Sequence, residues 1–501
     1  MWRVKSLDAI LATARKKSLH RSLGPVQLTL LGIGGVIGTG IFVLTAEAAQ
    51  KAGPGMMISF IIAGAVSAVA ALCYAELASM VPVSGSAYTY SYAVLGELVA
   101  WLVGWALILE YAVAASAVSV GWSGYIVGLL AHLPDPIIIP PELAAGPYAG
   151  GVFNLLAVVV ALAVTGLLVI GTRESATVNA VLVAVKLVAL SAFIWLALPV
   201  MTQSNFHPFT PLGTSGVIAA AASIFFAYVG FDAVSTAAEE TKNPQRNVPI
   251  GLIASLAICT VLYLLVAAAA IGSYGAQPVF GPNGEVLAPG SMALTAACGA
   301  FTDQPLVCSR EALAHVLRSI NYPVVGNLLG LAAGIALPTV ILMMIYGQTR
   351  IFFVMSRDGL LPEKLSTIHP RFRTPHVVTW ITGIAVAFAA AFLPVGRLAD
   401  ISNSGTLFAF AVVSVAVLVL RRTQPDRHRP FRTPLIWLFA PLSVAGCATL
   451  FAFLPWQAQL LFPIWSVIGL VFYFAYGYRH SHVGRGHTEV PEAEIPGPLS
   501  E

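Results

Sequence analysis

Charged side chains are scarce in this sequence of 501 residues. Asp, Glu, Lys and Arg make up 10% of it, against about 25% in a typical soluble protein, while hydrophobic residues make up 58%. The mean hydropathy is +0.84. So little charge excludes a protein whose surface is mostly in water, and the formal net charge of +4 does not indicate a nucleic-acid-binding surface.

Motifs that carry catalysis or a metal ion are missing too. There is no HExxH or GxSxG motif, and no histidine falls in the middle of a long apolar stretch. The apolar stretches lack the continuous polar stripe of a channel, and no soluble stretch is long enough for the output domain of a sensor. We therefore predict no enzyme activity, no catalytic residue, no metal site and no cofactor.

Cysteine is rare, with five residues in the chain. Cys73, Cys259 and Cys447 lie in apolar stretches and are most simply small hydrophobic residues. Cys298 and Cys308 lie instead in the long polar segment 274–322. They either form a disulfide, as an oxidising periplasm allows, or remain free thiols, and the sequence leaves both open.

The chain does contain many apolar stretches of about 20 residues, the length that a helix needs to cross about 30 Å of hydrocarbon. Backbone groups cannot bond to lipid, so such stretches predict helices. We predict an all-α integral membrane protein with twelve transmembrane helices. They are expected at residues 27–49, 56–80, 98–130, 153–171, 178–199, 215–238, 250–273, 324–355, 377–393, 403–420, 435–454 and 460–478.

The positions of Lys and Arg predict the orientation. With the N-terminus inside, 21 of the 26 Lys and Arg residues fall in cytoplasmic segments, and one, Lys186, falls within a span. The four expected outside are Lys51, Arg310, Arg318 and Arg397. Positive charge accumulates in cytoplasmic loops, so both termini are predicted to be cytoplasmic, as segment 1–26 and tail 480–501.

Two predicted spans combine a helix-breaking run with polar groups at mid-depth. Five of the nine residues from Gly32 to Gly40 are glycine, and the sixth span contains Gly230 and Asp232. Glycine destabilises a helix interior by about 1 kcal/mol relative to alanine. Breaks five spans apart predict an inverted repeat of two five-helix units, residues 27–200 and 215–421, followed by two helices in 434–479.

A helix break at membrane depth is tolerated where its backbone groups line an enclosed cavity. The half-helix beyond the break then offers unpaired N–H groups and the positive end of its dipole, which suit a carboxylate. The alternative is that the glycines allow close helix packing, for example through Gly34 and Gly38. The matching break in the sixth span favours a binding site.

These segments resemble a known superfamily. GIGGVIGTGIFVLTA and FFAYVGFDAVSTAAEETKNPQRNVPIG are similar to the amino acid–polyamine–organocation superfamily, and most similar to bacterial members of the cationic amino acid transporter family. Further similar segments are CYAELASMVPVSGSAYTYSY, GWALILEY, YGQTRIFFVMSRDGLLP and NSGTLFAF. The resemblance covers residues 24–477, although segment 274–322 is longer than it leads us to expect. It implies the leucine-transporter fold, with substrate held between the broken first and sixth helices.

The resemblance also implies how an amino acid would bind. The carboxylate would meet backbone N–H groups after the first break, and the ammonium would meet carbonyls freed at both breaks. The N–H groups belong to Gly38, Thr39 and Gly40, with the Thr39 hydroxyl, and the carbonyls to Val36, Phe226, Ala227 and Val229. Phe226 would close over the ligand from the outside, unless it is simply a packing aromatic.

Three ionisable residues lie deep in predicted spans, where charge is costly and usually has a function: Glu110, Lys186 and Asp232. The resemblance places Lys186 where sodium-coupled relatives hold sodium, in contact with the carbonyl near Gly34. Lys186 is therefore a candidate proton carrier together with Asp232, or else a permanent structural cation. Asp232 could instead tether the break, and Glu110 could face a cationic substrate or be a buried neutral acid.

The cytoplasmic loop SRDGLLPEKL, residues 356–365, is expected to contribute to an inner gate. The resemblance implies that Arg357 or Asp358 pairs with Glu76 or Glu239. The alternative is membrane anchoring plus a turn. The basic run at 421–432 is interpreted as a topology signal only.

The sequence predicts a secondary active transporter in a bacterial inner membrane, proton-coupled and independent of sodium, with no nucleic-acid partner. Its partners would be an L-amino acid, protons and the lipid bilayer. Met343 and Met344 suit an aliphatic pocket, which favours neutral amino acids of small to medium size. Transport of cationic amino acids, and amino-acid exchange, stay as alternatives. An amino-acid sensor on a transporter fold stays as an alternative from a different class.

Overall fold

The computed structural model describes residues 3–5, 7, 23–81, 86–171, 176–372 and 374–486. The side chains of Ala176, Thr177, Ala233, Thr236 and Glu239 are outside this description. Over these ranges the chain is helical, and its extended pairings are two isolated bridges, Leu23 with Thr241 and Phe280 with Val286. This agrees with the predicted all-α class.

Seven apolar helices in the described ranges are long enough to cross a membrane by length and composition, and five apolar helices are shorter. The long ones are Leu44–Met80, which joins α4 (Leu44–Ala52) to α5 (Met56–Met80), α7 (Glu97–Ala131), α10 (Ala176–Ala197), α13 (Pro244–Tyr274), α16 (Pro323–Arg357), α18 (Val395–Thr423) and α20 (Trp456–Phe472) with its extension to His480. The shorter ones are α2 (Pro25–Val36), α9 (Leu155–Ile170), α11 (Gly213–Ile224) with the following turn η5 (Phe225–Tyr228), α17 (His376–Phe392) and α19 (Ile436–Ala452). All overlap the predicted apolar stretches, while the number of crossings and the two five-helix repeats stay predictions.

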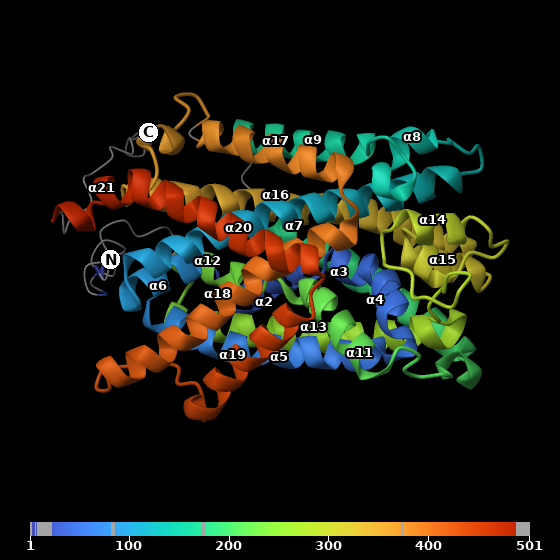
Figure 1. Ribbon diagram of the computed structural model, residues 1–501, viewed down its shortest axis with the longest axis horizontal. Coiled ribbons are helices and arrows are strands. Elements are labelled where there is room, and N and C mark those ends of the chain that lie inside the picture. The colour runs from blue at the N-terminus through green and yellow to red at the C-terminus, as the bar shows by residue number, and fades with distance from the viewer. Residues whose placement is uncertain are drawn as a thin grey trace.

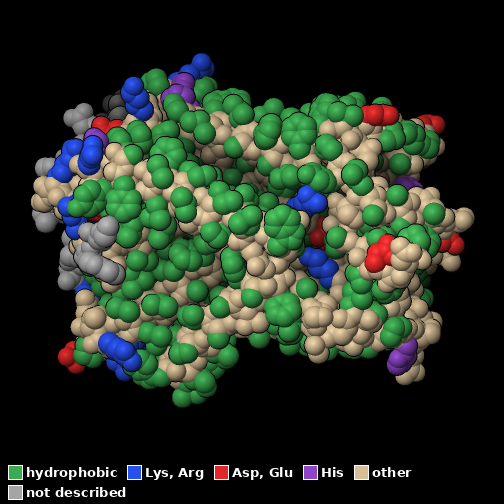
Figure 2. Space-filling model, in the orientation of Figure 1, with side chains coloured by type: hydrophobic (Ala, Val, Ile, Leu, Met, Phe, Trp, Pro, Cys, Tyr) green, Lys and Arg blue, Asp and Glu red, His purple; other side chains and the backbone are tan. Residues whose placement is uncertain are grey.

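The outer surface of the bundle is apolar. Trp195 and Val188 on α10 are 79% and 68% exposed, and Phe388 on α17 is 69% exposed. Figure 2 shows hydrophobic side chains across the middle of the molecule. Large apolar side chains would be costly in water but are at no disadvantage in lipid, so this surface suits a bilayer.

The broken helices lie inside the bundle. The α7 helix packs along α16 and α18, and α13 packs along α5 and α2. In Figure 1, α9 and α17 form one edge of the bundle and α5 and α19 the opposite edge, with α2 and α3 (Thr39–Phe42) between them. Long helices therefore enclose the first break and shield it from lipid.

The two ends of the bundle differ. One end carries α6 (Ser86–Val94) and α21 (Tyr478–His480), and the other carries α8 (Pro141–Ala144), α14 (Met292–Cys298) and α15 (Ala312–Ser319) (Figure 1). Lys and Arg side chains gather at the α21 end in Figure 2. This end corresponds to the predicted cytoplasmic side, and the orientation in the membrane itself stays a prediction.

The segment between α13 and α16 forms a cover at the opposite end. A disulfide links Cys298 of α14 to Cys308. The side chain of Gln50 on α4 donates to the carbonyls of Val279 and Leu287, at 2.7 and 2.9 Å, and accepts from the Val279 N–H. The outer half of the first helix is therefore bonded to this cover.

One predicted helix boundary is wrong. The tenth apolar stretch was expected to begin at residue 403, but α18 begins at Val395. Its first turns contain Asp400, which accepts hydrogen bonds from Lys51 and Ser223. Partners on α4 and α11 stabilise polar residues there, so the helix extends beyond its apolar part.

Candidate functional site

The first helix breaks where the glycines predict. Helix α2 ends at Val36, Ile37 and Gly38 are extended, and a new helix begins at Thr39. A Cβ added at Gly40 would lie 2.3 Å from Ala227 Cα, in the sixth helix region. Glycine is required here because another backbone occupies the space of a side chain.

The sixth helix region breaks in the same way. Helix α11 ends at Ile224, η5 follows, and helical structure resumes in α12 (Ala233–Thr236). Between them Gly230 has φ of +110°, a conformation that other residues rarely adopt. A Cβ on Gly230 would lie 2.7 Å from the Gly35 carbonyl oxygen, so the two breaks are in backbone contact.

The residues predicted to bind substrate thus come together. Those of the first break are Val36, Gly38, Thr39 and Gly40, and those of the sixth are Phe226, Ala227 and Val229; all are buried. The Thr39 hydroxyl is buried and has no hydrogen-bond partner among the described residues. A buried polar atom without a partner is costly, so this hydroxyl is available to a ligand.

Several freed carbonyls already have partners inside the protein. The Tyr263 hydroxyl donates to the Val36 carbonyl at 2.8 Å, and the Val229 N–H donates to the Phe226 carbonyl at 3.2 Å. The Asn403 amide donates to the carbonyls of Ala222 and Ser223, at 2.8 and 3.1 Å. An ammonium group would therefore share Val36 and Phe226 through their second lone pairs.

Tyr263 and Asn403 were not assigned a role from the sequence. A signal did exist, because Asn403 opens the segment NSGTLFAF and Tyr263 is a hydroxyl within an apolar helix. Both side chains stabilise backbone groups that the breaks leave without helical partners.

Lys186 is buried on α10, with 1% of its surface exposed. Its ammonium donates to the Gly34 carbonyl at 2.9 Å. Gly34 lies in the last turns of α2, and a Cβ there would lie 3.0 Å from Val183 and Asn179 of α10. A cation from the fifth predicted span is therefore in direct contact with the helix that ends at the first break.

Comparison with known proteins identifies the family. The amino acid permease family matches residues 23–474. The chain is 45% identical to the branched-chain amino acid permease BcaP of Bacillus subtilis over 97% of this chain and 99% of that protein. It is 43% identical to the methylthioribose transporter of the same organism, over 96% and 98%. The vacuolar cationic amino acid transporter 4 of Arabidopsis thaliana is 35% identical, over 81% and 64%.

The chain belongs to the amino acid permease family. The predicted resemblance is confirmed, and these relatives are permeases and transporters, which agrees with the prediction that the protein is not an enzyme. It is a multi-pass membrane permease.

Two acids of the permease lie close together beyond the breaks. Tyr111 donates to the Asp232 carboxylate at 2.8 Å. Glu110 is fully buried, and neither of its carboxyl oxygens has a close hydrogen-bond partner in the described ranges; Asp232 and the Thr406 hydroxyl are its polar neighbours. Met344 is buried, but the side chain that reaches the first break is Met343, whose sulfur would lie 3.1 Å from a Cβ on Gly35.

The expected gate pairing of Arg357 with Glu76 is wrong. Glu76 accepts hydrogen bonds from Arg421, at 2.7 and 2.8 Å, and from the Thr433 N–H, and its carboxylate lies 3.3 Å from Arg429. The side chain of Glu239 is outside the described residues. The 421–432 run therefore does more than mark topology, because two of its arginines neutralise the Glu76 carboxylate.

Asp358 has partners of its own at the α21 end. Its carboxylate accepts from the Lys5 ammonium at 2.8 Å and from the Tyr88 hydroxyl at 2.9 Å, and it is 5% exposed. This places the N-terminal segment, α6 and the end of α16 in one contact.

Replacing Asp358 with asparagine is expected to loosen this contact by about 1–3 kcal/mol, because the partly buried Lys5 ammonium loses its counter-charge. Hydrogen–deuterium exchange of the α6 amides should become faster in the variant. Arg357→Gln is the matched control, since its guanidinium Nε has no hydrogen-bond partner in the described ranges. Equal exchange in D358N and the unmodified protein would show that the contact does not hold α6.

Proposed function

We propose that this permease is a secondary active transporter for L-amino acids, with the substrate held between the two helix breaks. Transport proceeds by alternating access and is coupled to protons rather than sodium. The favoured substrates are neutral amino acids of small to medium size. The proposed topology has twelve spans in two five-helix repeats plus two helices, with both termini in the cytoplasm of a bacterium and the protein in its plasma membrane.

One observation carries the proposal: two broken helices touch at their breaks, beside a buried hydroxyl without a partner. An α-amino acid has one carboxylate and one ammonium, which match the N–H groups of a helix start and the carbonyls of a broken helix end. The half-helix that begins at Thr39 supplies the N–H groups for the carboxylate. The carbonyls near Val36 and at the sixth break accept from the ammonium, and they also accept from the Tyr263 hydroxyl and the Val229 N–H.

Support for protons over sodium comes from Lys186. A permanent cation site and a fixed ammonium would compete for the same carbonyl oxygens, and here the ammonium bonds to Gly34. On α16 the Thr339 hydroxyl donates to its own helix, to Ala336 at 2.7 Å. Because burial opposes the charge of a lysine, Lys186 can carry a proton that is released during the cycle.

Support for neutral aliphatic substrates comes from Met343 beside the first break. The 45% identity to the branched-chain amino acid permease of Bacillus subtilis also supports them. The cationic alternative rests on the buried Glu110 and on the plant cationic amino acid transporter. Amino-acid exchange is a third possibility within the same site. At the two ends, Asp358 with Lys5 and Tyr88 is proposed at an inner gate, and Asp400 with Lys51 and Ser223 at an outer one.

A second candidate follows from the methylthioribose transporter, which matches nearly the whole chain. Methylthioribose has neither a carboxylate nor an ammonium. It would use the Thr39 hydroxyl and neighbouring carbonyls through its own hydroxyl groups, without the zwitterion contacts. The two candidates differ in whether binding needs both charged groups.

Uptake into proteoliposomes tests the function. We expect labelled L-isoleucine or L-leucine to accumulate under an inward proton gradient, equally in sodium and in potassium buffer. Removal of the carboxylate or the amine from a competitor should abolish its ability to inhibit. Uptake of methylthioribose in place of amino acids would support the second candidate, and a requirement for sodium would contradict the proposed coupling.

A further inference from the structure

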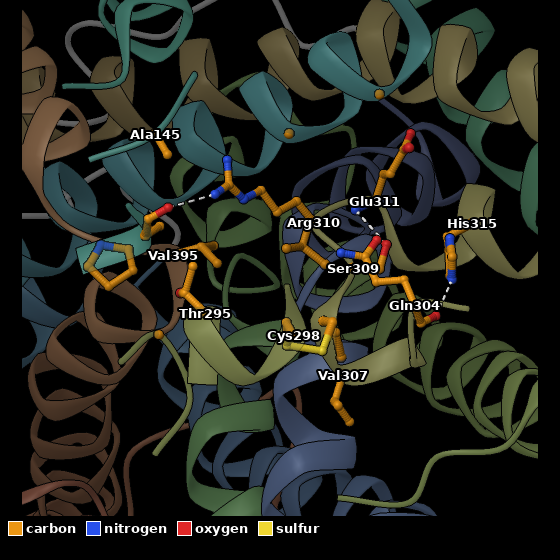
Figure 3. Close-up of a pocket in the computed structure, with 18 of the residues that line it drawn as sticks. Ala145, Thr295, Cys298, Gln304, Val307, Ser309, Arg310, Glu311, His315 and Val395 are labelled. Atoms are coloured by element: carbon orange, nitrogen blue, oxygen red, sulfur yellow. Dashed lines mark hydrogen bonds between the residues drawn. A yellow bond between two sulfur atoms is a disulfide. The ribbon is translucent and has the colours of Figure 1, made fainter. Parts of the chain in front are cut away.

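A cavity lies at the end of the bundle that carries α14 and α15. Its volume is about 670 Å³, and it lies between α4, α7 and the cover segment (Figure 3). Val43 and Gly121 contribute to its lining. A Cβ on Gly121 would lie 2.3 Å from the Thr39 side chain and 3.1 Å from Val43, so the cavity ends next to the candidate substrate site.

Arg310 is the cation in this cavity. Its guanidinium donates to the carbonyls of Ala144 and Ala149, at 3.4 and 2.9 Å, and Figure 3 shows the side chain extended toward Ala145. The residue keeps accessible surface although protein atoms crowd around it, and it lines the cavity. Two of its five N–H donors are engaged, so donors remain for another group.

The charge of Arg310 has no counter-charge in the described part of the chain, where no carboxylate lies within salt-bridge distance of its guanidinium. Its neighbour Glu311 points away from it in Figure 3 and instead pairs with Arg318, at 2.5 and 3.0 Å. Burial lowers the pKa of the Arg310 guanidinium from its ordinary value. A guanidinium that faces a cavity, with free donors and no counter-charge, is a site for a carboxylate, which it can hold through two hydrogen bonds.

We propose that this cavity is an outer binding site for the transported amino acid, with Arg310 holding its carboxylate before the substrate reaches the helix breaks. The inference rests on the proposed function, since it takes the transported molecule to be an amino acid. Glu47 of α4 and Asp303 of the cover line the same cavity, and their carboxylates are the partners proposed for the ammonium. Val43, Val120 and Leu294 provide apolar wall for a side chain.

The two sites then form a sequence along one path. The carboxylate first binds to a guanidinium under the cover, and next to the N–H groups that follow Gly38. Because Thr39 and Gly121 are in contact, the substrate passes between them only when the outer half of the first helix moves. Arg310 raises the local concentration of substrate at that point without touching it in the inner site.

Uptake kinetics of labelled L-isoleucine into proteoliposomes test this. Arg310→Gln is expected to raise the external KM about tenfold, the effect of one charge-assisted interaction, with the maximal rate within about twofold. Arg310→Lys should recover much of the loss. Arg397→Gln is the matched control: Arg397 lies near the same end, over the Tyr148 ring, and does not line the cavity, so its KM should not change.

Two further measurements separate this inference from the proposed function. In detergent, R310Q should keep the Kd of the inner site for L-isoleucine, because that site is intact, and lose the additional binding at the cavity. Added salt should raise the KM of the unmodified protein and leave that of R310Q almost unchanged, since salt screens the exposed charge. An unchanged KM in R310Q, or a salt-independent KM in the unmodified protein, would overturn the outer site while leaving the proposed function in place. Absence of amino-acid uptake by the unmodified protein would contradict the proposed function itself.

Discussion

Replacing Lys186 with alanine is expected to abolish the accumulation of amino acid driven by a proton gradient. The ammonium bonds to the Gly34 carbonyl in the helix that carries the first break. Its removal deletes the proposed proton carrier and leaves that carbonyl without its partner. Substrate contacts lie on other helices, so binding of L-isoleucine in detergent should persist while uptake against the gradient is lost. Uptake and binding are measured on the same preparation.

A matched variant separates charge from titration. Lys186→Arg keeps a cation at this position but cannot release a proton near neutral pH. It should retain substrate binding and lose gradient-driven accumulation, as the alanine variant does. If either variant still accumulates substrate against its gradient, Lys186 is a structural cation and protons are carried elsewhere.

Replacing Gly40 with leucine is expected to remove substrate binding at the inner site by more than about a hundredfold. A Cβ here would lie 2.3 Å from the Cα and 3.0 Å from the N of Ala227, and backbone cannot move aside as a flexible side chain can. The larger residue forces the two breaks apart, and the carboxylate and ammonium contacts are then no longer in reach of one ligand. Equilibrium binding of labelled L-isoleucine measures the loss.

The same substitution at Gly166 is the control. Gly166 lies on α9, and no atom lies within 4 Å of a Cβ placed on it. Gly166→Leu should keep both binding and uptake. If Gly40→Leu folds, as judged by monodispersity and thermal unfolding, and still binds isoleucine with unchanged affinity, the substrate does not bind between the breaks.

The sequence carried enough information to locate the two breaks. Gly230 and the glycine run around Gly38 can be recognised in the sequence, because helix-weakening residues are rare in the middle of an apolar span. Lys186 can be recognised in the same way, because a lysine is rare within an apolar span. These features could be predicted because each depends on residue type at one position, and lipid permits few explanations for it.

The partners of those features could not be predicted in the same way. Asn403 can donate to the Ala222 and Ser223 carbonyls only if α18 crosses α11 at the right height. Glu76 and Arg421 pair although they are 345 residues apart in the sequence. Many arginines at the same end of the bundle were equally available to Glu76. The choice among them depends on helix packing and loop paths, which do not show in the spacing of residue types.

The three hydrogen bonds of Gln50 make one mechanical unit of the outer half-helix α4 and the chain between Val279 and Leu287. If α4 tilts during transport, the cover tilts with it, because the Gln50 side-chain amide holds the two together. Opening the path to the breaks and uncovering the cavity are then a single motion with one energy barrier. In that motion the Cys298–Cys308 disulfide would keep the turn behind the fastened part of the cover closed, while the rest of the segment before α16 adjusts its path.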